Sequence, residues 1–84
     1  MKANLDVDTK RILVSLLASP KTASEVGRIH GIPVATVWQR IQRLQDLGLV
    51  REVLSFVDSS GQLRRYFEAI LLIDMAEEEA IVEF

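Results

Sequence analysis

The stretch TASEVGRIHGIPVATVWQRIQRLQDLGLV, residues 22–50, contains the start and stop signals of two successive helices. Thr22 with Glu25 three residues later is a capping box, which predicts a helix from about Ala23 to His30. Gly31 is a C-terminal stop signal. The apolar residues that we expect to face inward from this helix are Val26 and Ile29.

The second helix of this stretch follows after a very short turn. Pro33 suits the first turn of a helix, because its missing N–H has no helical partner there. The helix is predicted to continue to about Leu47 and to stop at Gly48. At about 100° per residue, one side of the helix is apolar and is expected to face the core: Val34, Val37, Ile41 and Leu44.

The opposite side of this helix is polar and carries no acid until Asp46. Thr, Gln and Arg side chains offer the hydrogen-bonding groups that read base edges in DNA. The alternative interpretation is an ordinary solvated helix face. The outward residues are Ala35, Thr36, Gln39, Gln42 and Arg43, with Trp38 and Arg40 on the two shoulders.

A helix is also expected before this stretch, from about Asp8 to Ala18. Asp6 or Asp8 can cap its start, and Ser19-Pro20 ends it. The residues that make its apolar stripe are Ile12, Leu13, Leu16 and Leu17, with Leu5 before them.

A β-hairpin is predicted after the stretch. Residues Val50 to Val57 are rich in β-formers, residues 58–61 are a turn cluster, and Gln62 to Ile73 contains no Gly or Pro. We expect the hairpin to pack on one face against the helices, with Arg64 and Arg65 just behind its tip. Asp74 and the acids after it favour a short C-terminal helix, and a continued or frayed strand is the alternative.

The length of 84 residues indicates one small domain spanning residues 1–84, with a core from 8 to 73, and the three predicted helices with the hairpin make it α+β. The absence of Cys and the single His exclude disulfides, thiolate metal sites and a histidine-rich metal centre. No apolar run is long enough for a membrane span, and early charges leave no secretory signal, so a soluble, cytoplasmic domain is expected. We found no catalytic set or phosphate-binding loop and expect neither an enzyme nor a cofactor.

The net charge of −2 is distributed unevenly along the chain. Residues 1–65 hold all ten Lys and Arg and six acids, a net of +4, whereas residues 66–84 hold six acids and no Lys or Arg. A polyanion would be attracted by the first part and repelled by the second. The alternative is a plain solvated acidic tail.

These segments resemble the winged helix-turn-helix transcriptional regulators of the ArsR-like, MarR-like and Lrp-type groups. The resemblance covers about residues 8 to 73, and Ser60 to Phe67 is similar to the wing of the ArsR-like group. Pro33 stands where many relatives have a capping serine. The metal-binding clusters of the ArsR-like group are missing, and His30 is interpreted as an exposed last-turn residue. The segments that carry the resemblance are residues 22–26, 31–32, 36–38, 41–44 and 46–50.

The resemblance implies that the third helix enters the major groove of DNA and that the wing touches the adjacent backbone or minor groove. Trp38 would lie close to the sugar-phosphate backbone or pack against the second helix. The other residues implied to face DNA are Ala35, Thr36, Gln39, Arg40 and Arg43 on the helix, and Ser59, Ser60, Gln62 and Arg64 on the wing.

The function expected from this resemblance is sequence-specific binding of double-stranded DNA in transcriptional regulation. The alternative is a winged-helix module that binds another protein of the transcription machinery. Surplus apolar residues predict a homodimer built from the first helix and the segment after Ile73. The operator, the sign of regulation and any small-molecule effector do not follow from the sequence.

Overall fold

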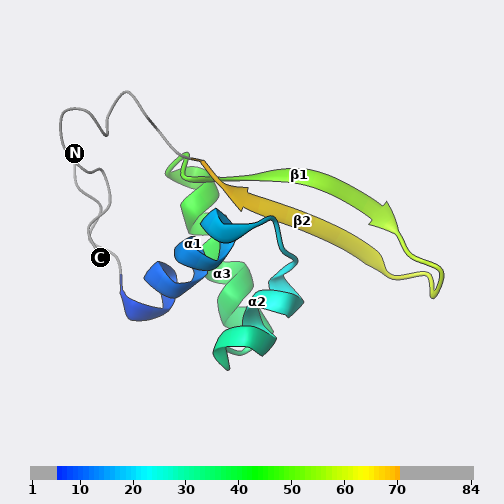
Figure 1. Ribbon diagram of the computed structural model, residues 1–84, viewed down its shortest axis with the longest axis horizontal. Coiled ribbons are helices and arrows are strands. Elements are labelled where there is room, and N and C mark those ends of the chain that lie inside the picture. Colours follow the sequence, from blue (N-terminus) through cyan, green and yellow to red (C-terminus); the bar gives the residue numbers. More distant parts are fainter. Residues whose placement is uncertain (1–5, 71–84) are drawn as a thin grey trace.

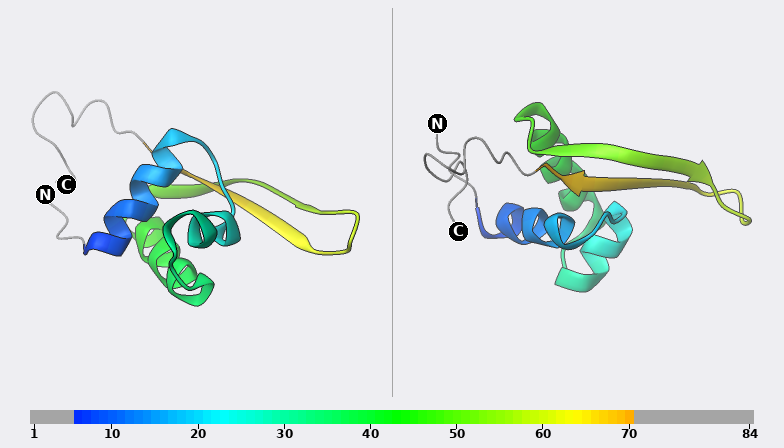
Figure 2. Two further views of the ribbon diagram at one scale, coloured as in Figure 1. Left: turned by 60° about the horizontal axis from the view of Figure 1, so that its bottom comes forward. Right: turned by 45° about the horizontal axis from the view of Figure 1, so that its top comes forward.

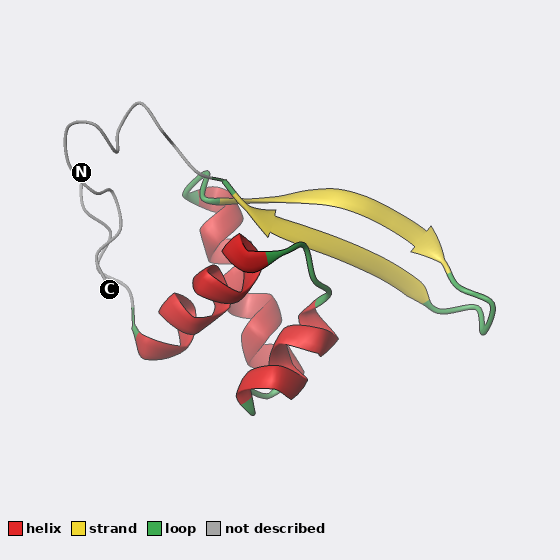
Figure 3. Ribbon diagram, viewed as in Figure 1, coloured by secondary structure: helices red, strands yellow, loops and turns green. Residues whose placement is uncertain are grey.

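The computed structural model describes residues 6–70. Three helices are followed by a two-stranded antiparallel hairpin, an α+β arrangement with the layout of a winged helix (Figures 1 and 3). The fold class predicted from the sequence is therefore confirmed. The predicted C-terminal helix from Asp74 lies outside the described residues. The elements are α1 (Val7–Ala18), α2 (Ala23–His30), α3 (Val34–Asp46), β1 (Val50–Val57) and β2 (Leu63–Ala69).

Helix α1 begins one residue earlier than predicted, because Asp6 is the N-cap. Its carboxylate accepts a hydrogen bond from the backbone N–H of Thr9 at 2.7 Å. Ile12, Leu13 and Leu16 are buried as expected, but Leu17 is exposed, so its predicted inward orientation is wrong. Leu17 lies at the edge of the apolar stripe, beside the buried Leu16.

Helix α2 is bounded by the signals that the sequence contains. The Thr22 side chain accepts from the Glu25 N–H at 3.1 Å, and the Glu25 carboxylate accepts from the Thr22 N–H at 2.9 Å. Gly31 ends the helix in the left-handed region at φ 67°, which a residue with a Cβ adopts at a cost. Both ends of α2 are therefore fixed by local interactions.

The turn between α2 and α3 depends on Gly27. The Ile32 N–H donates to the Gly27 carbonyl at 3.0 Å, and a Cβ on Gly27 would lie 2.7 Å from the Ile32 carbonyl oxygen. The chain therefore passes over α2 at a point where no side chain fits. This close approach sets how tightly α3 returns against α2.

Two apolar residues predicted to face the core do not. Ile29 is 57% exposed, because the buried stripe of α2 is formed by Ala23, Val26 and Gly27, and Ile29 lies roughly 110° round the helix from its middle. Val34 is also exposed, because it stands in the first turn of α3, where no preceding turn covers it. Pro33 is the N-cap and not the first helical residue.

The hairpin packs against the helices only at its base. Val50 and Phe67 are buried, whereas the rest of β1 is exposed, so the expected packing of one face against the helices is found at the base of the hairpin. The distal end of the hairpin projects beyond the helices (Figure 2). Lys21 forms an isolated bridge with Phe67 and holds β2 at this base.

One cluster of apolar side chains forms the core of the described residues. Phe67 is its largest fully buried member and contacts Trp38 of α3. No described helix is both long and apolar enough to cross a membrane. The cluster consists of Ile12, Leu13, Leu16, Ala23, Val26, Ile32, Val37, Ile41, Leu44, Leu49, Val50 and Phe67.

Candidate nucleic-acid interface

The polar side of α3 is open, as the helical wheel predicts. Ala35, Gln39 and Arg43 are exposed and Thr36 is half-buried, while Val37, Ile41 and Leu44 on the opposite side are fully buried. No described acid lies within ion-pair distance of Arg43. The helix therefore presents hydrogen-bonding groups and one positive charge to the surroundings. The exposed residues that complete this side are Gln42 and Gln45.

Arg40 is turned away from that open side and toward the start of α1. Its Nη2 atom lies 3.2 Å from the Asp6 carboxylate, and its side chain is 32% exposed. Hydrogen bonds from Thr9 lower the pKa of Asp6 below its usual 3.8, and the charges of Arg40 and Arg43 lower it further. Arg40 therefore joins α3 to α1, and its charge is shared with Asp6.

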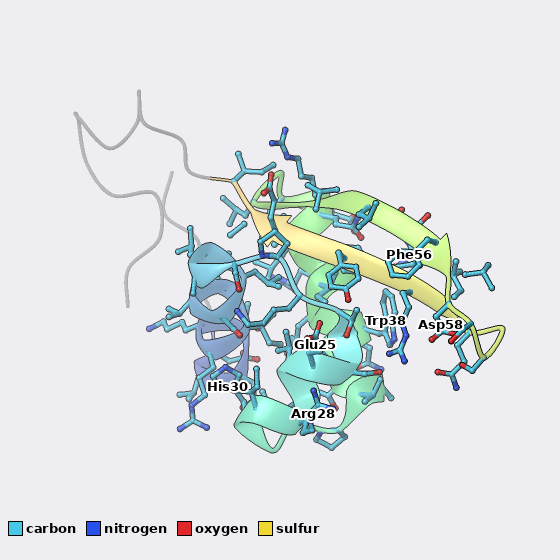
Figure 4. All side chains as sticks on the ribbon, turned by 45° about the vertical axis from the view of Figure 1, so that its right-hand side comes forward. Glu25, Arg28, His30, Trp38, Phe56 and Asp58 are labelled. Atoms are coloured by element: carbon cyan, nitrogen blue, oxygen red, sulfur yellow. The ribbon has the colours of Figure 1, made fainter. Side chains whose placement is uncertain are left out.

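Trp38 packs against the hairpin, a contact that was not predicted from the sequence. Its ring meets the Phe67 ring edge-to-face, with centroids 5.4 Å apart and planes at 86°. The Arg65 guanidinium lies 5.1 Å from the centroid of the Trp38 ring. The side chain stays 36% exposed beneath the hairpin (Figure 4). Trp38 is thus a fixed contact between α3 and β2.

The hairpin arginines are each held by a carboxylate of the hairpin. Nε of Arg65 donates to Glu52 at 2.7 Å, and Nε of Arg51 donates to Glu68 at 2.7 Å. Nε of Arg64 donates to Asp58 at 2.8 Å. Residues 50–70 hold these three arginines and these three acids, a net charge of zero, whereas residues 6–49 carry a net of +2. The positive charge of the described residues therefore lies on the helices.

The tip of the hairpin is fixed by Asp58. Its carboxylate accepts from the Ser60 N–H and hydroxyl and from the Gln62 N–H, at 2.7–3.0 Å, besides Arg64. These hydrogen bonds, first the one from the Ser60 hydroxyl, hold the pKa of Asp58 far below its usual 3.8. Ser59, Ser60 and Gln62 are exposed, as predicted, and Arg64 is half-buried.

A groove of about 360 Å³ lies where the hairpin curves over the start of α2. Thr22 and Glu25 use each other's backbone N–H groups, so the N–H groups of Ala23 and Ser24 are left without an acceptor among residues 6–70. The side chains of Arg64 and Arg65 line the same groove from β2. The lining residues are Thr22, Ala23, Ser24, Trp38, Gln62, Leu63, Arg64 and Arg65.

The groove contains residues that sequence reasoning did not select. Ser24 and Arg65 are the clearest cases. The capping box places Ser24 in the first turn of α2, where backbone N–H groups have no helical acceptor. That signal in the sequence could have identified Ser24. No local signal indicates that Arg65 stacks on Trp38, because that contact joins two elements far apart in the chain.

Within residues 6–70, no group of three or more His, Asp or Glu side chains is placed to hold a metal ion. His30 is the last residue of α2, as predicted, but it is half-buried and not exposed. Its Nε2 atom is buried and has no hydrogen-bond partner among the described residues. It lies far from the hairpin tip, where Asp58 is found (Figure 4).

Comparison by sequence assigns no family to the chain. It matches no protein-family model and no curated protein. The fold and the geometry of the α3–hairpin surface therefore carry the functional argument.

Proposed function

We propose that this protein is a sequence-specific DNA-binding transcriptional regulator. In this proposal α3 lies in the major groove and reads base edges with Thr36, Gln39 and Arg43, while the hairpin follows the adjacent backbone toward the minor groove. The observation that carries it is the open polar side of α3 beside a hairpin that projects well beyond the helices. A cytoplasmic location goes with this function.

The groove beside α3 supports the proposal because it offers donors of the kind that bind phosphate. The Arg65 guanidinium is fixed by the Trp38 ring and by Glu52, which engages Nε and leaves the two terminal nitrogens for another acceptor. The groove is also lined by Ala23 and Ser24, whose backbone N–H groups have no acceptor among residues 6–70. A DNA strand running between α3 and the hairpin would find donors on both sides.

The proposal includes a homodimer that binds two half-sites about one helical turn apart, roughly 34 Å. On α1, the apolar residues Val14 and Leu17 are exposed, which is the surface expected for association with a second copy. The segment after Ile73, expected to share this interface, lies outside the described residues. Light scattering at micromolar concentration tests whether the protein is a homodimer. A mass of one chain, unchanged when the residues after Asp74 are deleted, would contradict the homodimer.

DNA binding itself is tested by selecting bound sequences from a random duplex pool and titrating the selected duplex at several salt concentrations. A DNA-binding protein enriches a motif, and its affinity falls with salt by a slope of about −0.9 per phosphate neutralised. The second candidate function, binding to another protein, is favoured by the zero net charge of the hairpin and by its exposed apolar side chains. It predicts no enriched motif and no steep salt dependence.

A further inference from the structure

The distal hairpin ends in an apolar pair. Val57 and Leu63 are cross-strand partners, immediately before and shortly after the turn. They are 65% and 62% exposed, the highest values among the large hydrophobic residues of the hairpin. An exposed apolar pair near the projecting end of a small domain is a candidate contact site for a binding partner, because exposure of apolar side chains to water is unfavourable.

This pair lies on the face of the hairpin that is turned toward α3. Cross-strand partners point to the same face, and alternate residues along a strand share a face. Leu63 therefore shares its face with Arg65 and Phe67, which contact Trp38 of α3. Leu63 also lines the groove. A ligand in the groove would therefore meet Leu63, next to its cross-strand partner Val57.

The hairpin carries no net charge that would attract such a ligand to its tip. All three arginines of residues 50–70 are engaged with carboxylates of the same hairpin, as described above. Asp58 also fixes the turn between Val57 and Leu63 through four hydrogen bonds, including those from Ser60 and Arg64. The pair is therefore presented on a pre-ordered, electrically neutral support.

We propose that Val57 and Leu63 form an apolar wedge that enters the minor groove of duplex DNA and opens a base step, bending the duplex. This proposal rests on the proposed DNA-binding function and extends it from sequence reading to DNA deformation. Apolar side chains inserted at a base step kink DNA and allow more protein surface to contact it. The surrounding serines, Ser59 and Ser60, suit the sugar edges at the rim of such a groove.

The test compares the full chain with V57T/L63T on the selected duplex. Threonine keeps the β-propensity of both positions, so thermal stability is expected to match that of the parent. The matched control is L54T, because Leu54 is also exposed, at 54%, but lies on the opposite face of the hairpin. Affinity is measured by fluorescence anisotropy, and bending by energy transfer between dyes on the two duplex ends.

The parent is expected to bend the duplex. V57T/L63T should bind roughly tenfold more weakly and lose most of the bend, with an unchanged salt slope because no phosphate contact is removed. L54T should behave as the parent does. A double variant that bends and binds normally, or an L54T with the same defect, would overturn the wedge while leaving DNA binding intact.

Two further outcomes also count against the wedge. If the parent binds no duplex at all, the proposed function fails and the wedge falls with it. If V57T/L63T abolishes self-association of the parent and leaves DNA binding and bending unchanged, the pair contacts a second copy and not DNA.

Discussion

The Trp38 ring of α3 contacts the Phe67 ring of β2 edge-to-face, with their centroids 5.4 Å apart. Phe67 is fully buried and Trp38 is partly open, so the contact runs from the core to the surface. It also supports the Arg65 guanidinium, which lies 5.1 Å from the Trp38 centroid and 5.4 Å from that of Phe67. The position of the hairpin relative to α3 therefore depends on this aromatic pair.

Replacing Phe67 should weaken the whole domain. Phe67→Ala is expected to lower the free energy of unfolding by about 3–5 kcal/mol, because it leaves a cavity where the hairpin meets the helices. Phe67→Leu, which fills more of the space, should cost about 1.5 kcal/mol or less. Urea denaturation measures both. Phe56→Ala is the control, because Phe56 is exposed and stacks only on Tyr66; an equal loss there would contradict the assignment.

Arg43 and Arg40 should affect DNA binding differently. Arg43→Ala is expected to cost roughly 1–3 kcal/mol on the selected duplex and little on random duplex, as for a contact to a guanine edge. Arg40→Ala should weaken binding to both by similar amounts, because it lowers the positive charge of α3 without removing a base contact, Arg40 being paired with Asp6. Anisotropy titrations on the two duplexes measure this. The recognition-helix assignment would be wrong if both variants bound both duplexes like the parent.

The loss of the Arg40–Asp6 pair is a separate consequence of the Arg40 substitution. Asp6 is 53% exposed, so the pair is expected to contribute between 0 and about 1 kcal/mol to stability. Asp6→Asn removes the same pair without removing Arg40. If weaker DNA binding by Arg40→Ala came from a change in α1 packing, Asp6→Asn would reproduce it.

The substitution Gly27→Ala should destabilise the protein. In an unhindered helix this change stabilises by about 1 kcal/mol, because alanine has the higher helix propensity. Here the new Cβ would lie 2.7 Å from the Ile32 carbonyl oxygen, so we expect a net loss of about 1–3 kcal/mol. Thermal unfolding measures it, and the exposed neighbour Arg28, changed to Ala, serves as the control. An increase in Tm for Gly27→Ala would show that the turn is looser than described.

Asp58 should titrate below its usual pKa of 3.8. Its folded-state pKa is lowered, so its contribution to stability is present above about pH 3.8 and is lost as the pH falls further. Ser60→Ala and Arg64→Gln should each raise the pKa of Asp58 toward 3.8, because each removes a donor to the carboxylate. Carboxyl ¹³C titration by NMR measures this. A midpoint at or above 3.8 in the parent would mean that the turn is not ordered by Asp58.

Many features of the fold are predictable from short stretches of the chain. The capping box at Thr22 and the stop at Gly31 act within one helical turn, so their residue types were enough to place the ends of α2. The buried side of α3, with Val37 at its centre, follows from the helical period alone. The turn cluster between Val57 and Leu63 likewise predicted the hairpin.

The candidate site depends on contacts between elements, and no local pattern contains them. The placement of Trp38 on Phe67, and that of Arg40 on Asp6, required the helices and hairpin to be assembled. The same holds for the exposure of Ile29, which shares the apolar character of Val26 but falls outside the stripe that α3 covers. Whether a residue is buried depends on which neighbouring elements pack over it. Capping and periodicity depend on a few adjacent residues, so they can be predicted from the sequence without knowledge of the tertiary structure.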